Sequence, residues 1–459
     1  MRVEYRESFE AFVQEVMRTY KGQGIGIIGF DRDNLEYQYF YGYKDVETQS
    51  PIDLNTIFGI ASISKSFTNI GLMKLVEKNK INLEDKVDQY IPELKLPESQ
   101  MPKIKHLLSH TAGFWPQERF LMNDLAHALE FPDNLELAGN TTLSQKGLEM
   151  VVNRLNQALS FNGEPGKYHS YCNFSYGLIT SIIERLSDEK SYVEYMMNEV
   201  IGPLGLDRTF FDFQKTKKVD NISKLYENVL GHLNTLDDYT DQGFVLLGGG
   251  AIKSTLNNLM TYTRLYLNGG KHEGKPFISE ALLEEMSKPY VQYKPFEAYG
   301  FGLINGKFDG IAYAGHSGGL TGVSSFFGFT KETGKGIVVL CNTSNVPVTA
   351  IGLAALKMMN DKLPDWKMQS FDPITWTLEE IEKTLGVYKS DEGANIEIRA
   401  DGTSGISWWQ GQEEMPVTLV SADAVLVYNK MIWSYTPIIR DEKGYARAVY
   451  SGSRLIPKK

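Results

Sequence analysis

The sequence predicts a mixed α/β (α+β) protein in which a helix-flanked sheet is followed by a C-terminal β module. Apolar runs typical of strands occur early, at residues 24–30 and 35–41, and again late, at residues 322–329 and 336–341. The chain between these groups is mostly helical in periodicity. A sheet that combines both groups and carries the helical part as an insertion is the simplest arrangement that buries their apolar faces.

Composition limits the class of protein. A chain of 459 residues is too long for one compact core, and its 42% hydrophobic and 23% charged residues are typical of globular domains. The net charge of −10, without any basic cluster, predicts no nucleic-acid partner and no membrane partner. The N-terminus lacks the apolar core of a secretory signal, so we expect a cytoplasmic protein unless a signal has been trimmed.

Several helices are predicted before residue 300. Residues 7–20 have the pattern of an amphipathic helix. Residues 62–76 carry no charge between Lys65 and Lys74, which predicts a helix buried on all sides. The region from 77 to 160 is polar and irregular, and further helices are expected around residues 176–186 and 257–267. A strand is expected at residues 300–303.

The C-terminal part has a different pattern. Residues 363–376, with two prolines, indicate a linker, and Thr377 with Glu380 forms a capping box that opens a short helix. Closely spaced short strands then predict a small antiparallel barrel or sandwich, at about 394–399, 406–410, 415–420, 424–428, 431–439 and 445–451. The predicted division is therefore residues 1–362, 363–376 and 377–459.

Some motifs are set aside. Cys172 and Cys341 lie in apolar stretches and are expected to be buried free thiols. Residues 269–275 have the spacing of a phosphate-binding loop, but Pro276 replaces the required hydroxyl, so a turn is expected. His106 and His110 lack a third metal ligand. We therefore predict neither a metal site nor a cofactor.

Residues 315–319 match the G-x-S-x-G nucleophile elbow of α/β-hydrolases. That arrangement requires a histidine after the serine, and none follows His316. It also requires a helix behind the serine, whereas residues 320–329 are β-like. We expect this segment to serve another purpose.

A stronger nucleophile candidate is Ser62, in the S-x-x-K pattern with Lys65. Three residues apart on a helix, the two side chains share a face. Lys65 is the only charge at the head of a buried helix, where desolvation and the helix dipole both disfavour its ammonium form. Such an amine can take the proton of Ser62. The same spacing at Ser187 and Lys190 lies in a charged helix end, which predicts solvated surface.

Tyr171 and Asn173 could supply a second proton-transfer group. A phenol near an ammonium can act as base or acid, and an amide two residues on can anchor lysine and substrate. The same spacing occurs at residues 226–228 and 266–268, and Asn173 has the alternative role of helix N-cap.

The third element is the glycine-rich segment around residue 318. A glycine-rich strand edge lets a substrate backbone approach closely, and the amides of Ser62 and Gly319 could hold a developing oxyanion. On this interpretation the substrate-binding residues are His316, Ser317, Gly318 and Gly319. The alternative is an ordinary glycine-rich turn.

Taken in the order S-x-x-K, Y-x-N and H-x-G, residues 7–355 resemble the serine β-lactamase and penicillin-binding-protein-like superfamily, in its class C-like branch of peptidases and esterases. Supporting segments are residues 57–61, 106–113, 164–166, 248–250 and 299–302. The resemblance implies a β-lactamase/transpeptidase-like α/β/α sandwich with the active site between sheet and helical insertion. The C-terminal module resembles the lipocalin-like domain of some peptidases that favour D-residues.

The same resemblance implies roles for the residues. Ser62 would be the acylated nucleophile, Lys65 its proton partner, Tyr171 the general base and Asn173 an anchor, with His316 and Ser317 on the substrate-carbonyl side. His316 stands where true β-lactamases usually carry lysine. We expect a serine hydrolase of amide or peptide bonds, including those of D-residues. A carboxylesterase and a penicillin-binding sensor without turnover remain alternatives, and the substrate is a small molecule or peptide. The oligomeric state is not predicted.

Overall fold

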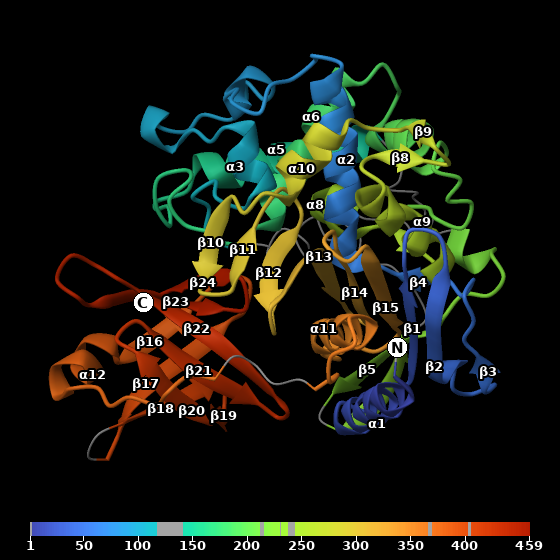
Figure 1. Ribbon diagram of the computed structural model, residues 1–459. Helices are drawn as coiled ribbons and strands as arrows, with labels where there is room; N and C mark the ends of the chain where they lie inside the picture. The colour runs from blue at the N-terminus through green and yellow to red at the C-terminus, as the bar shows by residue number, and fades with distance from the viewer. Residues whose placement is uncertain are drawn as a thin grey trace.

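The computed structural model describes residues 2–116, 141–211, 215–229, 231–236, 244–365, 370–402 and 405–459 (Figure 1). Its centre is a nine-stranded sheet in the order β10-β11-β12-β13-β14-β15-β1-β2-β3, with antiparallel pairing throughout. The early and late strands meet where β1 pairs with β15, for example Ile27 opposite Val339. The predicted sheet from both ends of the domain is therefore confirmed.

The strands of this sheet match the predicted apolar runs at β1, β2, β14 and β15, whereas the other five were not predicted. The strands are β1 (Gly24–Phe30), β2 (Leu35–Asp45), β3 (Ser50–Pro51), β10 (Val291–Lys294), β11 (Glu297–Tyr299), β12 (Ile304–Phe308), β13 (Ile311–Leu320), β14 (Val323–Thr330) and β15 (Lys335–Cys341). The predicted strand at 300–303 is wrong. Those residues form the turn between β11 and β12, where the Gly300 amide donates to the Leu303 carbonyl at 2.8 Å and Gly302 has φ +69°.

Helices cover both faces of this sheet. Successive side chains of a strand point to opposite faces. On β15, Ile337 and Val339 pack against α1 (Val3–Thr19) and α11 (Val348–Met359), whereas Val338 and Leu340 face the core that contains α9 (Leu256–Leu267) and α2 (Ser64–Glu77). The expected α/β/α layering is thus confirmed, with α11 absent from the predicted elements.

The helical insertion lies mainly between β3 and β10 (Figure 1). Its helices are η1 (Ala61–Ile63), α2, η2 (Val87–Gln89), η3 (Glu98–Gln100), α3 (Ile104–Leu108), α5 (Thr141–Asn156), α6 (Asn173–Leu186), α7 (Tyr192–Met196), η4 (Met197–Ile201), η5 (Lys215–Lys217), α8 (Phe244–Gly250), α9 and α10 (Glu280–Ser287). Its short strands are β4 (Phe58–Gly59), β5 (Leu225–Val229), β6 (His232–Leu236), β7 (Lys253–Ser254), β8 (Lys271–His272) and β9 (Lys275–Pro276).

One part of the insertion differs from expectation. The region 77–160 was expected to be irregular, yet it contains α5, which buries Leu148, Val151, Val152 and Leu155 at helical spacing. Residues 117–140 of that region lie outside the described residues. Residues 269–275 form the predicted turn, since β8 and β9 pair as a hairpin there.

The C-terminal module begins with α12 (Leu378–Thr384), whose predicted capping box is confirmed: Thr377 Oγ1 accepts from the Glu380 amide at 3.2 Å and Glu380 Oε2 accepts from the Thr377 amide at 2.7 Å. Its strands pair antiparallel, as expected, in a four-stranded and a five-stranded sheet. They are β16 (Gly386–Lys389), β17 (Asn395–Asp401), β18 (Gly405–Gln410), β19 (Glu413–Met415), β20 (Val417–Ser421), β21 (Ala424–Asn429), β22 (Ile432–Arg440), β23 (Ala446–Ser451) and β24 (Arg454–Pro457).

These two sheets share one core rather than closing into one barrel within the described chain. Ile396 and Trp408 of the first sheet pack with Val425 and Val449 of the second. The edges of the two sheets meet at an isolated bridge between Tyr388 and Lys458, and the closed barrel of the prediction is not observed within the described residues.

The module packs on the edge of the nine-stranded sheet that is formed by β10 to β12 (Figure 1). Tyr450 and Leu455 share a small core with Tyr293 and Tyr299. The Tyr450 hydroxyl donates to the His169 carbonyl at 2.7 Å. This places the β23–β24 hairpin next to the segment that contains Tyr171. Across the described ranges, no helix combines the length and the apolar character needed to cross a bilayer.

Candidate functional site

Ser62 and Lys65 lie at the junction of η1 and α2, where the chain enters the helical insertion. Ser62 is half-buried, and Lys65, one turn further on, has no exposed surface. Lys65 Nζ donates to Ser62 Oγ at 3.2 Å, so the predicted sharing of one helix face holds. Ala61, immediately before the serine, has φ +46°, a conformation that costs about 1–2 kcal/mol for an L-residue.

The amine of Lys65 is enclosed by polar and aromatic groups. It donates to the Gly249 carbonyl at 2.7 Å, and it lies 4.8 Å and 5.1 Å from the ring centroids of Tyr171 and Tyr176. A Cβ added at Gly249 would lie 3.1 Å from Lys65 Nζ and 3.7 Å from Asn173 Oδ1. The lack of a side chain at Gly249 therefore leaves space beside it for the Lys65 amine and the Asn173 amide.

Tyr171 and Asn173 are both nearly buried at the start of α6. Asn173 is the first residue of this helix, and the N-cap position belongs to Cys172. The two other copies of the pattern have different partners: the Tyr226 hydroxyl accepts from the Val46 amide at 2.8 Å, and the Tyr266 hydroxyl bonds to that of Tyr262 at 2.9 Å. Only the copy at 171 meets Lys65.

Strand β13 passes close to the backbone of Ser62. A Cβ added at Gly318 would lie 2.3 Å from the Ile60 carbonyl oxygen and 2.9 Å from the Ser62 amide nitrogen. A Cβ added at Gly319 would meet nothing within 4 Å, and this residue is exposed. Ser317 is half-buried. The structure thus brings β13 at Gly318 close to Ser62 and leaves open space at Gly319.

His316 is buried, and protein atoms engage both of its ring nitrogens. Nδ1 lies 2.5 Å from the Ser317 carbonyl oxygen, which can only accept, so Nδ1 donates and Nε2 accepts from the Tyr299 hydroxyl at 2.9 Å. Burial, reinforced by the charge of Lys65, lowers the pKa of His316 to about 3. The imidazole is neutral near pH 7, and contact with a substrate would require one of these bonds to break.

Two further histidines shape the site. His110 Nδ1 accepts from the Cys172 amide at 3.2 Å, and its ring centroid lies 4.1 Å from that of Tyr171. Burial lowers the pKa of His110 well below its usual value and lowers that of His169 to about 3. From the sequence, His110 was considered only as a metal ligand and set aside, and His169 was not singled out. A lone buried histidine has no sequence signature that distinguishes it.

The pair His106 and His110 does not share a helix face, because α3 ends at Leu108. His106 Nδ1 instead accepts from the Lys103 amide at 3.2 Å. Within the described ranges, no group of three or more His, Cys, Asp or Glu side chains is placed to hold a metal ion.

Arg454, the first residue of β24 in the C-terminal module, was not predicted as a site residue. Its guanidinium carbon lies 4.8 Å from the Tyr171 ring centroid. Its Nε forms an ion pair with Glu392 Oε2 at 2.5 Å. Because β24 was not among the predicted strands, nothing in the local sequence indicated that this arginine reaches the site.

The remaining motifs have the expected places. Residues 315–319 lie within β13, without the helix that a nucleophile elbow requires. Lys190 is exposed. Cys172 and Cys341 are buried thiols outside any disulfide bond, as predicted.

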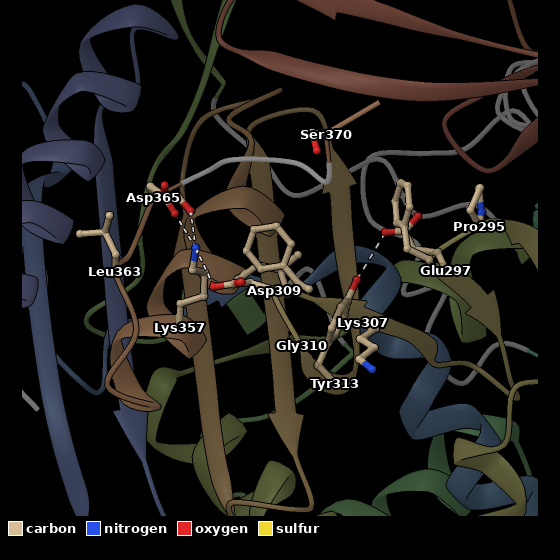
Figure 2. A pocket seen from close by; sticks show the side chains of 13 residues that line it. Pro295, Glu297, Lys307, Asp309, Gly310, Tyr313, Lys357, Leu363, Asp365 and Ser370 are labelled. Atoms are coloured by element: carbon tan, nitrogen blue, oxygen red, sulfur yellow. Dashed lines mark hydrogen bonds and ion pairs between the residues drawn. The ribbon is translucent and has the colours of Figure 1, made fainter. Parts of the chain in front are cut away.

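A cavity of about 820 Å³ lies elsewhere, between β12, β13 and α11, and Leu363, Asp365 and Ser370 also line it (Figure 2). Its charged side chains interact with one another: Lys357 lies between Asp309, at 3.3 Å, and Asp365, and the Tyr313 hydroxyl donates to Glu297 at 3.4 Å. None of the predicted site residues lines this cavity.

A serine hydroxyl beside a buried lysine at the head of a helix, within an α/β/α fold, is typical of the serine hydrolases with the β-lactamase fold. The profile of the Beta-lactamase family matches residues 9–357, and the chain belongs to this family. The family resemblance inferred from the motifs is therefore confirmed.

Individual relatives are distant. The chain is 26% identical to penicillin-binding protein 4* of Bacillus subtilis, over 69% of this chain and 67% of that one. It is 23% identical to D-aminopeptidase of Brucella anthropi, over 69% of this chain and 55% of that one, so it matches about half of that relative's length. The structure of the octameric penicillin-binding protein homologue from Pyrococcus abyssi covers 98% of this chain and 99% of its own, with 25% identity and a TM-score of 0.68.

The close approach of β13 to Ser62 gives a matched pair of substitutions. Gly318→Ala places a methyl group against backbone atoms and should destabilise the protein by about 1–3 kcal/mol. Gly319→Ala has open space and should change stability by less than about 0.5 kcal/mol. Thermal unfolding of both variants measures the difference. A Gly318→Ala variant as stable as wild type would contradict the described approach of β13.

The buried histidines predict acid lability. The pKa values of His106, His169 and His316 fall from 6.5 to about 4, 3 and 3, so each imidazole is neutral when folded and gains a proton on unfolding below pH 6.5. Their contribution is fully present above about pH 6.5 and should decline as pH falls, by up to ~1.4 kcal/mol per pH unit for each histidine. Urea unfolding at a series of pH values tests this. His169→Gln should flatten the dependence, whereas His232→Gln, on the exposed strand β6, should not.

Proposed function

We propose that this protein is a serine hydrolase that forms an acyl-enzyme on Ser62. The observation that carries the proposal is the 3.2 Å contact between Ser62 Oγ and the amine of a lysine with no exposed surface. A hydroxyl becomes a useful nucleophile when a neighbouring base takes its proton, and a buried amine is such a base.

In the proposed reaction, the proton of Ser62 passes to the Lys65–Tyr171 pair as Oγ attacks the substrate carbonyl carbon. The backbone amides of Ser62 and Gly319 hold the oxyanion of the tetrahedral intermediate, and Asn173 anchors the substrate. When the intermediate collapses, Tyr171 returns the proton to the departing nitrogen or oxygen. Water then attacks the ester on Ser62 and releases the acid. No cofactor takes part.

We propose amide or peptide bonds as the substrate, including bonds to D-residues. The similarity to D-aminopeptidase supports this class of substrate. The buried, neutral His316 gives the third motif no positive charge with which to bind the carboxylate of a lactam antibiotic. On this basis we expect weak hydrolysis of such antibiotics.

The role of Ser62 is tested by a fluorophosphonate probe and intact mass. Wild type should gain one adduct and Ser62→Ala none, with hydrolysis reduced by several orders of magnitude. Ser187→Ala is the matched control, since Ser187 has the same spacing to a lysine but lies at the end of α6 near exposed Lys190. It should keep the adduct and the rate. A Ser62→Ala variant with near wild-type turnover would refute the proposal.

Turnover of a panel of substrates, together with intact mass, distinguishes the alternatives. The panel contains p-nitroanilides of D- and L-amino acids, p-nitrophenyl esters and a chromogenic cephalosporin. Turnover of esters alone would indicate a carboxylesterase. A persistent lactam adduct without release would indicate a sensor.

Tyr171→Phe removes only the phenolic hydroxyl. If Tyr171 transfers the proton, kcat should fall about 10²- to 10⁴-fold. The fluorophosphonate probe should still label Ser62, and the protein should remain folded. The control is Tyr226→Phe, because the Tyr226 hydroxyl accepts a hydrogen bond from the Val46 amide and does not contact Lys65. An unchanged kcat for Tyr171→Phe would make this residue structural.

A further inference from the structure

We propose that Arg454 of the C-terminal module is a positioning residue of the active site, which favours the deprotonated form of the Tyr171 side chain. The C-terminal module would then be part of the catalytic machinery and not only an appendage. The catalytic meaning of this inference rests on the proposed function, but the electrostatic effect itself does not.

The hairpin that carries Arg454 is fixed against the Tyr171 segment by backbone hydrogen bonds. The Tyr171 amide donates to the Ser453 carbonyl at 2.9 Å, and the Leu455 amide donates to Ser170 Oγ at 3.3 Å. The residues on both sides of Arg454 are therefore bonded to the residues at and before the tyrosine. These two hydrogen bonds hold the backbone of Arg454 beside the Tyr171 ring.

The side chain of Arg454 is itself held in place. Its Nε pairs with Glu392 at 2.5 Å, and the guanidinium carbon stays 4.8 Å from the Tyr171 ring centroid. An arginine keeps its charge at every pH at which a protein is folded. Arg454 is 30% exposed and Glu392 is 19% exposed, so solvent screens this charge only in part.

The other titratable groups that face Tyr171 add little positive charge near neutral pH. His110, after α3, and His316, on β13, have ring centroids 4.1 Å and 6.2 Å away, and burial keeps both imidazoles neutral. Tyr299, on β11, lies 6.5 Å away, and burial raises its pKa well above the usual value, so it is also uncharged. Within the described ranges, the basic side chains over this ring are Lys65, at 4.8 Å, and Arg454, and the arginine stays charged whichever member of the Lys65–Tyr171 pair holds the proton.

A positive charge within about 4–6 Å favours the phenolate form of a tyrosine by about one to three pH units. Lys65 and Tyr171 lie close enough to exchange a proton, so they titrate as a coupled pair. Removal of the Arg454 charge makes the first deprotonation of that pair harder, whichever member loses the proton. The acid limb of the rate profile should therefore move to higher pH.

The experiment compares Arg454→Met with Arg447→Met. Arg447 is the matched control because it lies on β23 of the same hairpin, 4.8 Å over the ring of Tyr168, and donates to the Asn162 carbonyl at 2.6 Å. In Arg454→Met, the acid limb of kcat/KM should rise by about one pH unit, with a ~10-fold loss on the acid side that recovers at alkaline pH. Arg447→Met should keep the wild-type profile, and Arg454→Lys, which keeps the charge, should stay near it.

A second measurement does not depend on turnover. In protein labelled with ¹³C at tyrosine Cζ, the Tyr171 resonance is assigned by its loss in Tyr171→Phe, and its titration is followed directly. Arg454→Met should raise its pKa by about one pH unit or more. This measurement stands even if the phosphonate probe fails to label Ser62, so failure of the proposed function and failure of this inference can be separated.

Two results would overturn the inference. An equal loss of rate at every pH, with an unmoved Tyr171 titration, would make Arg454 a structural residue. A rise of KM confined to substrates with a free carboxylate, again with an unmoved titration, would make it a substrate-binding residue.

Discussion

The burial of the Lys65 amine is the constraint on which the rest of the site depends. An amine without solvent is costly unless the protein supplies partners, and here these are the Gly249 carbonyl, the Ser62 hydroxyl and the faces of two tyrosine rings. These partners come from three parts of the insertion. The glycine-rich end of α8, the start of α6 and the turn before α2 must therefore meet at one point.

Local sequence patterns were sufficient to predict much of this architecture. Ser62 and Lys65 could be identified because their three-residue spacing, at the head of a helix with no charge between Lys65 and Lys74, is visible in the sequence itself. Strand β1 coincides with its apolar run, and the capping box at Thr377 was located by two residues. The relation of Tyr171 to Lys65 could be predicted only through the family resemblance, since the same Y-x-N spacing occurs at two other places.

What remained unpredicted depends on contacts between distant segments. Arg454 reaches Tyr171 only because β24 pairs with β23 and the hairpin docks beside the tyrosine, and no local pattern encodes that docking. The C-terminal strands were recognised, but their division into two sheets depends on which edges pair, which alternation along one strand does not specify. The misplaced strand at 300–303 has an apolar composition but a turn geometry required by Gly302.

The pairing of β1 with β15 also has a consequence for biosynthesis. All seven residues of β1 are buried in the finished protein, and one of its edges bonds to residues 336–341. During translation, β2 can pair with one edge of β1 at once. The other edge of β1, which pairs with β15, stays unpaired until most of the domain has left the ribosome. The nascent chain thus carries an apolar strand with one unpaired, aggregation-prone edge for a long period. Chaperone supply and translation speed, more than final stability, should set the yield of soluble protein.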